Sequence, residues 1–202
     1  MKRFLSFFFA LSLLISTGTA SALTLSLEPS ATSVAVGSAF TVDLMVSGVN
    51  PTGAAPLPVG AFDIDVWFDP MLMSFTGYQL GNSLGAVDTE ALDWSWGEFT
   101  PGIIDLAELS LLSPAELEAI GQPESFSLAT LEFLCLGMGT SQIGIDDSDP
   151  LFTYNVVDAW GDSFAVTVAD PVTIAQTPEP GTMLLLASGL AGLAGTRRRR
   201  KK

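Results

Sequence analysis

Residues 60–70 read GAFDIDVWFDP, and the spacing of their apolar residues indicates the class of fold. Large apolar residues occupy every second position, and mostly acidic residues fill the positions between them: Phe62, Ile64, Val66 and Phe68, alternating with Asp63, Asp65 and Trp67. Successive side chains of a β-strand point to opposite faces, so this period of two predicts a strand with one buried and one outward face. Asp69 and Pro70 predict the turn that ends it.

The same alternation recurs along the chain from Leu23 to Thr177. Further strands are predicted over 23–27, 40–46, 103–110, 126–136, 142–145, 152–157 and 164–168. Glycine, proline and acidic residues separate these runs, as turn residues do. Short strands interrupted this often predict an all-β fold, either an antiparallel sandwich or a barrel.

One short helix is predicted within this β domain. Ser113, Pro114 and Glu116 combine an N-cap serine, a proline at the first helical position and the glutamate of a capping box. Gly121 is placed to end the helix and Pro123 prevents its continuation. With two turns at most, the helix is expected to cover an end or an edge of the sandwich.

The distribution of charge excludes several functions. The chain of 202 residues has 22 acids, 8 bases and no histidine, and no Lys or Arg lies between Phe4 and Thr196. Nucleic-acid binding needs Lys and Arg against the phosphates, so we expect no nucleic-acid partner. Histidine-dependent catalysis is also excluded. The single cysteine, Cys135, cannot form an internal disulfide.

The N-terminus reads as a signal peptide over residues 1–22. Lys2 and Arg3 precede an apolar run, and Ala20 and Ala22 supply the small residues that a signal peptidase requires, so that cleavage would leave Leu23 as the first residue. The alternative is an uncleaved N-terminal anchor, for which the apolar run is short. The body of the chain is therefore expected to be exported.

The C-terminus has three parts in a fixed order. Pro178, Glu179, Pro180 and Gly181 form a stiff, non-helical spacer, residues 182–195 form an apolar helix, and six cations follow: Arg197, Arg198, Arg199, Arg200, Lys201 and Lys202. The positive-inside rule predicts that this basic run stays in the cytoplasm. The thirteen residues 183–195 span about 20 Å as a helix, which is short of the roughly 30 Å hydrocarbon core and suits a temporary anchor.

These three parts resemble the PEP-CTERM sorting signal of Gram-negative bacteria. The resemblance implies that exosortase, an integral-membrane transpeptidase, recognises Pro178, Glu179, Pro180 and Gly181 and removes the tail. It also implies a transient inner-membrane anchor, followed by the cell surface or extracellular matrix. The alternative is an ordinary tail anchor. The expected domains are a signal peptide at 1–22, a β-sandwich at 23–175 and a sorting signal at 176–202.

The body resembles cohesin domains in several of its strands. The similar segments are 36–42, 60–70, 127–133 and 139–141. The resemblance implies a jelly-roll-like sandwich of about nine antiparallel strands, related to carbohydrate-binding modules, into which the short helix is inserted. No dockerin repeat is visible in the chain, so the partner that cohesins usually bind is not inferred from it.

Two sets of residues are candidate binding sites. Trp94 and Trp96 would share one face of a strand, where exposed rings could form a platform for a sugar, with Asp93, Ser95 and Glu98 nearby. If the rings are buried, they belong to the core. Asp146, Asp147 and Asp149 could form a weak calcium site, and so could Asp63, Asp65 and Asp69, because Ca²⁺ takes several oxygen ligands. The alternative for both acidic groups is a solvated polar surface.

The sequence favours a non-catalytic surface or matrix protein associated with exopolysaccharide or a biofilm. It names no catalytic residue and no cofactor other than calcium. The first alternative is a module that binds a sugar or another protein through a sandwich face. The second is a secreted hydrolase that uses two carboxylates, which no motif singles out.

Overall fold

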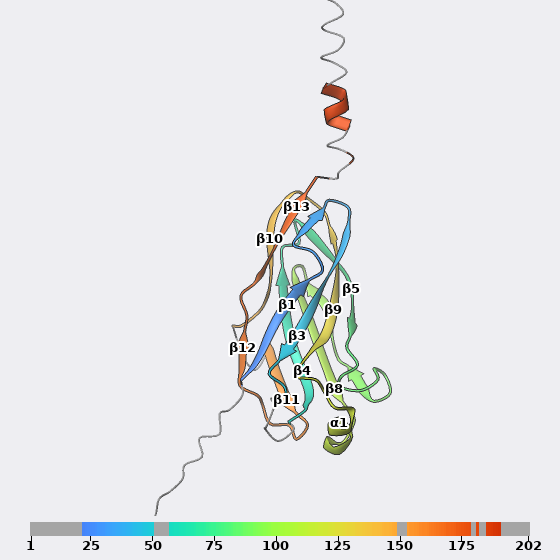
Figure 1. Ribbon diagram of the computed structural model, residues 1–202, viewed down its shortest axis with the longest axis vertical. Coiled ribbons are helices and arrows are strands. Elements are labelled where there is room, and N and C mark those ends of the chain that lie inside the picture. The colour runs from blue at the N-terminus through green and yellow to red at the C-terminus, as the bar shows by residue number, and fades with distance from the viewer. Residues whose placement is uncertain (1–21, 51–56, 149–152, 179–180, 182–184, 191–202) are drawn as a thin grey trace, which may run out of the picture.

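The computed structural model describes residues 22–50, 57–148, 153–178, 181 and 185–190. These residues form two packed sheets and one short helix (Figure 1). The first sheet has the order β12-β1-β3-β9-β5: Val166–Val168, Leu23–Pro29, Ala39–Ser47, Ser125–Cys135 and Met73–Leu80. The second has the order β2-β13-β10-β4-β8-β6: Ser33–Ala35, Val172–Thr177, Gly139–Ile145, Val59–Phe68, Ile103–Ser110 and Ala91–Asp93. In the second sheet, β11 (Tyr154–Asp158) also pairs with β4, and β7 (Gly97–Thr100) pairs with β8.

The predicted antiparallel sandwich is confirmed. Nine strands have five or more residues, while β2, β6, β7 and β12 have only three or four and supplement the expected set. Two of these short strands, β12 and β2, pair in parallel with β1 and β13, and the other paired strands run antiparallel. β12 lies within the strand predicted over 164–168. The other three, β2, β6 and β7, lack the length over which an alternating pattern becomes visible, which is why the sequence did not predict them.

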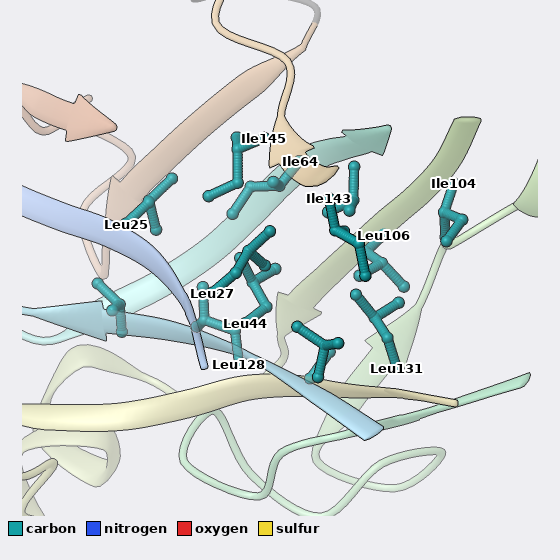
Figure 2. Close-up of a cluster of buried hydrophobic side chains, with 14 of the residues drawn as sticks. Leu25, Leu27, Leu44, Ile64, Ile104, Leu106, Leu128, Leu131, Ile143 and Ile145 are labelled. Carbon is teal, nitrogen blue, oxygen red and sulfur yellow. The ribbon is translucent and has the colours of Figure 1, made fainter. Parts of the chain in front are cut away.

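The core lies between the two sheets and follows the alternation in the sequence. In β4, Phe62, Ile64, Val66 and Phe68 are all buried. Leucines and isoleucines from both sheets meet them in one continuous cluster (Figure 2). Phe133 of β9 lies within 6 Å of three other rings, those of Phe40, Phe68 and Phe75. Each fully buried aliphatic or aromatic side chain of this kind stabilises the fold by about 1.5–3 kcal/mol.

The helix α1 (Pro114–Ile120) begins and ends as its sequence predicts. Ser113 and Glu116 form the capping box, and Gly121 ends the helix with a left-handed φ of 71°. Leu117 is its one buried residue, so the helix covers the end of the sandwich where β8 stops (Figure 1). Gln122 follows it and is buried, where its amide bonds both backbone groups of Val59 at 2.7 and 2.8 Å. This side chain therefore takes the place of a neighbouring strand at the start of β4.

The last strand, β13, was not among the predicted strands, and it passes the predicted end of the domain. β13 runs to Thr177, two residues past the predicted boundary at 175, because Gln176 is buried and pairs with Gly139 of β10. Thr177 and Pro178 are exposed. Gly181 and residues 185–190 are helical, and the rest of the expected helix at 182–195 lies outside the described residues. Within the part of the chain that the structure describes, no helix has both the length and the apolar character needed to cross a membrane.

Candidate functional site

The two candidate tryptophans lie in a bulge at the edge of the second sheet. β6 and β7 both pair with β8, so they act as one interrupted edge strand. Asp93 lies opposite Glu108 and Gly97 lies opposite Asp105, so the three residues 94–96 face only the two residues 106–107. The expectation that Trp94 and Trp96 lie on a regular strand is therefore wrong, because one extra residue is accommodated between β6 and β7.

The bulge is held in place by side chains that substitute for ladder hydrogen bonds. The Ser95 hydroxyl accepts from the Ala107 N–H at 3.0 Å and donates to the Ala107 carbonyl at 3.3 Å. The Trp96 N–H donates to Asp105 Oδ1 at 2.7 Å. Gly97 then returns the chain to the ladder with a φ of 66°, a conformation that favours glycine. These bonds hold the backbone of residues 95–97 against β8.

Both rings are directed to solvent, so the alternative that they belong to the core is excluded. Trp94 is 62% exposed and Trp96 is 80% exposed. The Trp96 ring packs edge-on against the exposed Phe99, at a centroid distance of 6.4 Å. The Trp94 ring instead borders a shallow pocket of about 190 Å³ on the outer face of the sheet. Its other outward-facing lining residues come from β4, β8 and β11: Ala61, Asp63, Ala107, Leu109, Asn155 and Val157.

Carboxylates lie beside this pocket on the outer face. Asp65 of β4 lies opposite Asp105 of β8, and Asp63 is two residues away on the same face. Asp63 is exposed, whereas Asp65 is buried. The Asp65 N–H donates to the Thr153 carbonyl at 2.8 Å and the Asp65 carbonyl accepts from the Asp146 N–H at 2.9 Å, so residues before β11 and after β10 both lie against it. Burial, then the charges of Asp105, Asp63 and Asp146, raise the pKa of Asp65 to about 6. The expectation that Asp65 is a solvated outward residue is therefore wrong.

Glu108 is a buried acid that the sequence analysis did not single out. It continues the inward-facing series of Ile104 and Leu106 on β8, and both of its carboxylate oxygens are enclosed without a hydrogen-bond partner. Burial, and then the charge of Asp93, raise the pKa of Glu108 to about 7. An acid in the apolar phase of a strand was the signal that could have identified it. Because its oxygens are enclosed, this carboxylate is not accessible to a substrate.

The expected calcium ligands are placed only in part. Asp146 and Asp147 follow β10, and Asp146 Oδ1 accepts from the Ser148 N–H at 2.9 Å, while Asp149 lies outside the described residues. Asp69 ends β4 and accepts from the Met71 N–H at 2.9 Å. Among the residues that the structure describes, no three acids, or acids with Cys135, come close enough to hold a metal ion. Calcium at Asp146, Asp147 and Asp149 stays a prediction.

The two predicted processing sites lie next to the first and the last strand of the sandwich in the sequence. Leu23 is the first residue of β1 and is buried, with its N–H donating to the Ala165 carbonyl at 2.9 Å. Pro178 follows β13, and Glu179 and Pro180 lie outside the described residues, as do residues 1–21 and the basic run 197–202.

Comparison with known proteins gives one match for the C-terminal segment and another for the sandwich. Residues 176–200 match the PEP-CTERM protein-sorting motif. No curated protein has a significant sequence similarity to the chain. Solved cohesin structures share the fold of the sandwich. A type II cohesin from the cellulosome of Acetivibrio cellulolyticus superposes with a TM-score of 0.61 at 17% identity, and the match covers 76% of this chain and 95% of that one.

Two further structures agree with this result. A type II cohesin of Acetivibrio cellulolyticus, solved in a Cohesin-X-Dockerin complex, gives a TM-score of 0.63 at 11% identity, over 77% of this chain and 99% of that one. A cohesin module from a family 33 glycoside hydrolase of Clostridium perfringens gives 0.56 at 15% identity, over 77% and 98%. At these identities the similarity shows the fold alone. The chain thus joins a β-sandwich with the cohesin fold to a C-terminal PEP-CTERM protein-sorting motif.

Proposed function

We propose that this chain is an exported surface protein, that an exosortase-type membrane transpeptidase processes it at the C-terminal sorting motif, and that its sandwich is a non-catalytic binding module. The observation that carries the proposal is the sorting motif at residues 176–200, which begins within the last two residues of the final strand of a cohesin-like sandwich. A signal peptide at 1–22 and signal peptidase complete the route of export. The proposal places the protein first at the inner membrane of a Gram-negative cell and then at its surface or in the extracellular matrix.

The position of the motif supports recognition by a processing enzyme. β13 ends at Thr177, and both Thr177 and Pro178 are exposed. Prolines have no N–H to donate to a sheet, so Pro178 and Pro180 prevent the strand from continuing. We therefore expect Glu179, which follows β13 in the sequence, to act as a recognition residue for the enzyme.

The outer face of the second sheet supports binding of a neutral polysaccharide. The exposed Trp94 ring offers an apolar surface for a sugar ring, and Asp63 and Asn155, which line the same pocket, offer hydrogen-bond partners for its hydroxyls. Between Leu23 and Thr177 the chain has 21 acids and no Lys or Arg, so an anionic polymer would be repelled. A neutral exopolysaccharide of a biofilm is the ligand that fits this pocket.

A second candidate is a protein partner. A relative in fold was solved in a Cohesin-X-Dockerin complex. Exposed aromatic residues are typical anchors of protein interfaces. Trp96 and Phe99 are both exposed, and their rings contact each other beside the bulge. A dockerin-like protein would use this pair, whereas a sugar would use the pocket beside Trp94.

Binding of the exported full chain to purified neutral exopolysaccharide tests the proposal. We expect Trp94→Ala to abolish measurable binding in co-sedimentation, because it removes the wall of the pocket. Trp160→Ala is the matched control, since Trp160 is also exposed but lies in the turn after β11. Undiminished binding by the Trp94 variant would refute the polysaccharide site. Retention of a cellular protein that depends on Trp96 would favour the protein partner.

A further inference from the structure

The end of the sandwich from which the C-terminal tail leaves has an exposed apolar tip. The tip consists of Met71, Leu136 and Met138, in the turn between β4 and β5 and the turn between β9 and β10. Met71 is 81% exposed and Met138 is 65% exposed. The Leu136 N–H donates to the Leu72 carbonyl at 2.9 Å, which ties the two turns together.

The tip lies beside the point where the tail begins. Gly139, the residue after Met138, pairs with Gln176, and the Thr177 carbonyl accepts from the Val36 N–H at 2.9 Å. Val36 belongs to a third turn at the same end of the sandwich. In this turn the Gly37 N–H donates to the Cys135 carbonyl at 2.8 Å, which connects the turn to the end of β9. β13 thus ends next to the tip, and α1 lies at the opposite end (Figure 1).

The tip is poor in charge, although the domain as a whole is strongly acidic. Three of the segments at this end of the sandwich, 29–42, 133–145 and 171–178, contain no Asp or Glu. Next to the turn between β7 and β8 at the same end lies one acid, Glu98, whose Oε1 accepts from the Gly102 N–H at 3.0 Å. The one acid in the turn between β4 and β5 is Asp69, which accepts a hydrogen bond from the Met71 N–H. The opposite end has Glu116, Glu118, Glu124, Asp158 and Asp162. An anionic membrane surface would repel that acidic end more strongly than it would repel the tip.

The length of the segment between the last strand and the apolar run limits how far the tip can lie from the membrane. Only Pro178 to Gly181 separate Thr177 from the apolar run that begins at Thr182. Even fully extended, the six steps from Thr177 to Met183 span about 20 Å. The headgroup layer on each side of the hydrocarbon core is roughly 5–8 Å thick. While the tail is inserted, the tip is therefore held next to the headgroups.

From these observations we infer that Met71, Leu136 and Met138 insert into the headgroup region of the bilayer while the tail anchors the chain. This inference rests on the proposed function, because the tail brings the domain to the membrane. The contact holds the domain upright with its acidic end away from the lipid. It also positions Pro178 to Gly181 at the membrane surface, where a membrane enzyme acts. Removal of the tail ends the tethering and releases the tip.

Site-specific labelling tests this orientation. The chain is expressed in a bacterium that lacks an exosortase, and the exported form with its tail is reconstituted in phosphatidylcholine vesicles. An environment-sensitive fluorophore is attached at Met71→Cys, or at Glu118→Cys in α1 as the control for the opposite end. The native Cys135 is buried, and burial raises the pKa of its thiol, so it reacts poorly with the label.

We expect the fluorescence emission of the label at position 71 to shift to shorter wavelength in vesicles and to be quenched by brominated lipid. The emission of the label at position 118 should show neither change. Met138→Glu in the chain labelled at position 71 should reduce the quenching, whereas Leu111→Glu, the same kind of change beside α1, should not.

If the two labels behave alike although the chain floats with the vesicles, the inference is overturned while the proposed anchoring stands. The tip would then be a contact for a membrane protein. A chain that does not float overturns the anchoring itself, and the inference with it.

Discussion

Asp93 lies directly opposite Glu108 in the ladder between β6 and β8, yet the two carboxylates have opposite environments. Asp93 is exposed and accepts from the Tyr78 hydroxyl at 2.8 Å and from the Ser95 N–H at 2.9 Å. Glu108 is enclosed with no partner for either oxygen. Because burial disfavours the charged form, Glu108 retains its proton up to a pH of about 7, the value to which its pKa is raised.

The first prediction follows from the Glu108 carboxyl. Its pKa rises from 4.5 in the unfolded chain to about 7 in the fold, so the folded state binds the proton more tightly. The free energy of unfolding should therefore be highest below pH 4.5 and fall as the pH rises toward 7. Glu108→Gln should remove much of this fall, which is worth roughly 3 kcal/mol at most. Thermal melts across this pH range measure it.

Asp65 contributes a similar fall at lower pH, since its pKa rises from 3.8 to about 6. The Glu108 variant should therefore retain a residual slope at acidic pH. Glu118→Gln, at an exposed position on α1, is the control and should leave the pH profile of stability unchanged. An unaltered profile for Glu108→Gln would show that this carboxylate is solvated in the folded protein.

The second prediction concerns Gln122 and the start of β4. Its amide bonds the N–H and the carbonyl of Val59 and also donates to the Ser83 carbonyl at 2.9 Å. Gln122→Leu keeps the size of the side chain but leaves the backbone of the fully buried Val59 unpaired. We expect the free energy of unfolding to fall by about 2–4 kcal/mol, because each unpaired buried group costs about 1–3 kcal/mol. Chemical denaturation checks this, and a loss under 1 kcal/mol would contradict the role of Gln122 as a substitute strand.

The third prediction concerns the charge of the domain. Between Leu23 and Thr177 there are 21 acids with no Lys or Arg to offset them, so the folded domain repels itself. Added NaCl should raise the melting temperature, because salt screens this repulsion. Calcium should raise it further than magnesium at equal ionic strength if Asp146, Asp147 and Asp149 bind it. Melting that is independent of salt would mean that the acids are too dispersed to matter.

The fourth prediction concerns the basic run at the C-terminus. Deletion of residues 197–202 removes all cations after the apolar segment, and these cations set the cytoplasmic end of the anchor. We expect the truncated chain to lose membrane arrest and processing, while its sandwich remains folded. Fractionation of cells into membrane and exported fractions measures the effect. Normal arrest and processing of the truncated chain would show that the apolar segment suffices.

Most of the sandwich was predictable from sequence because its long strands place apolar residues at every second position, as β3 and the 62–68 part of β4 do. β5 was not predicted, because a register shift between Phe75 and Gly77 interrupts its alternation. The helix α1 was predictable because its caps are encoded locally. The bulge at residues 94–96 was not, since it depends on the Ser95 hydroxyl reaching Ala107 on another strand. The burial of Asp65 was missed for a related reason, because it depends on contacts with residues far away in the sequence, Asp146 and Thr153.

The apolar tip was also beyond prediction. Met71 and Met138 are 67 positions apart in the sequence, and only the pairing of β5 with β9 brings their turns together. Single exposed methionines are ordinary on protein surfaces. These methionines become candidates for membrane contact because they lie at the end of the domain from which the tail leaves, and that position follows from the topology.

Intact mass spectrometry of the exported protein tests the central claim most directly, because one measurement reports both ends of the chain. We predict a wild-type mass that lacks residues 1–22 and the apolar and basic tail from 182 onward. Glu179→Ala should melt as the wild type does, because Glu179 follows the exposed end of β13, but should retain the tail in the membrane. A wild-type product that still contains residues 182–202, or a Glu179 variant processed at the normal rate, would contradict exosortase processing and leave a plain membrane anchor.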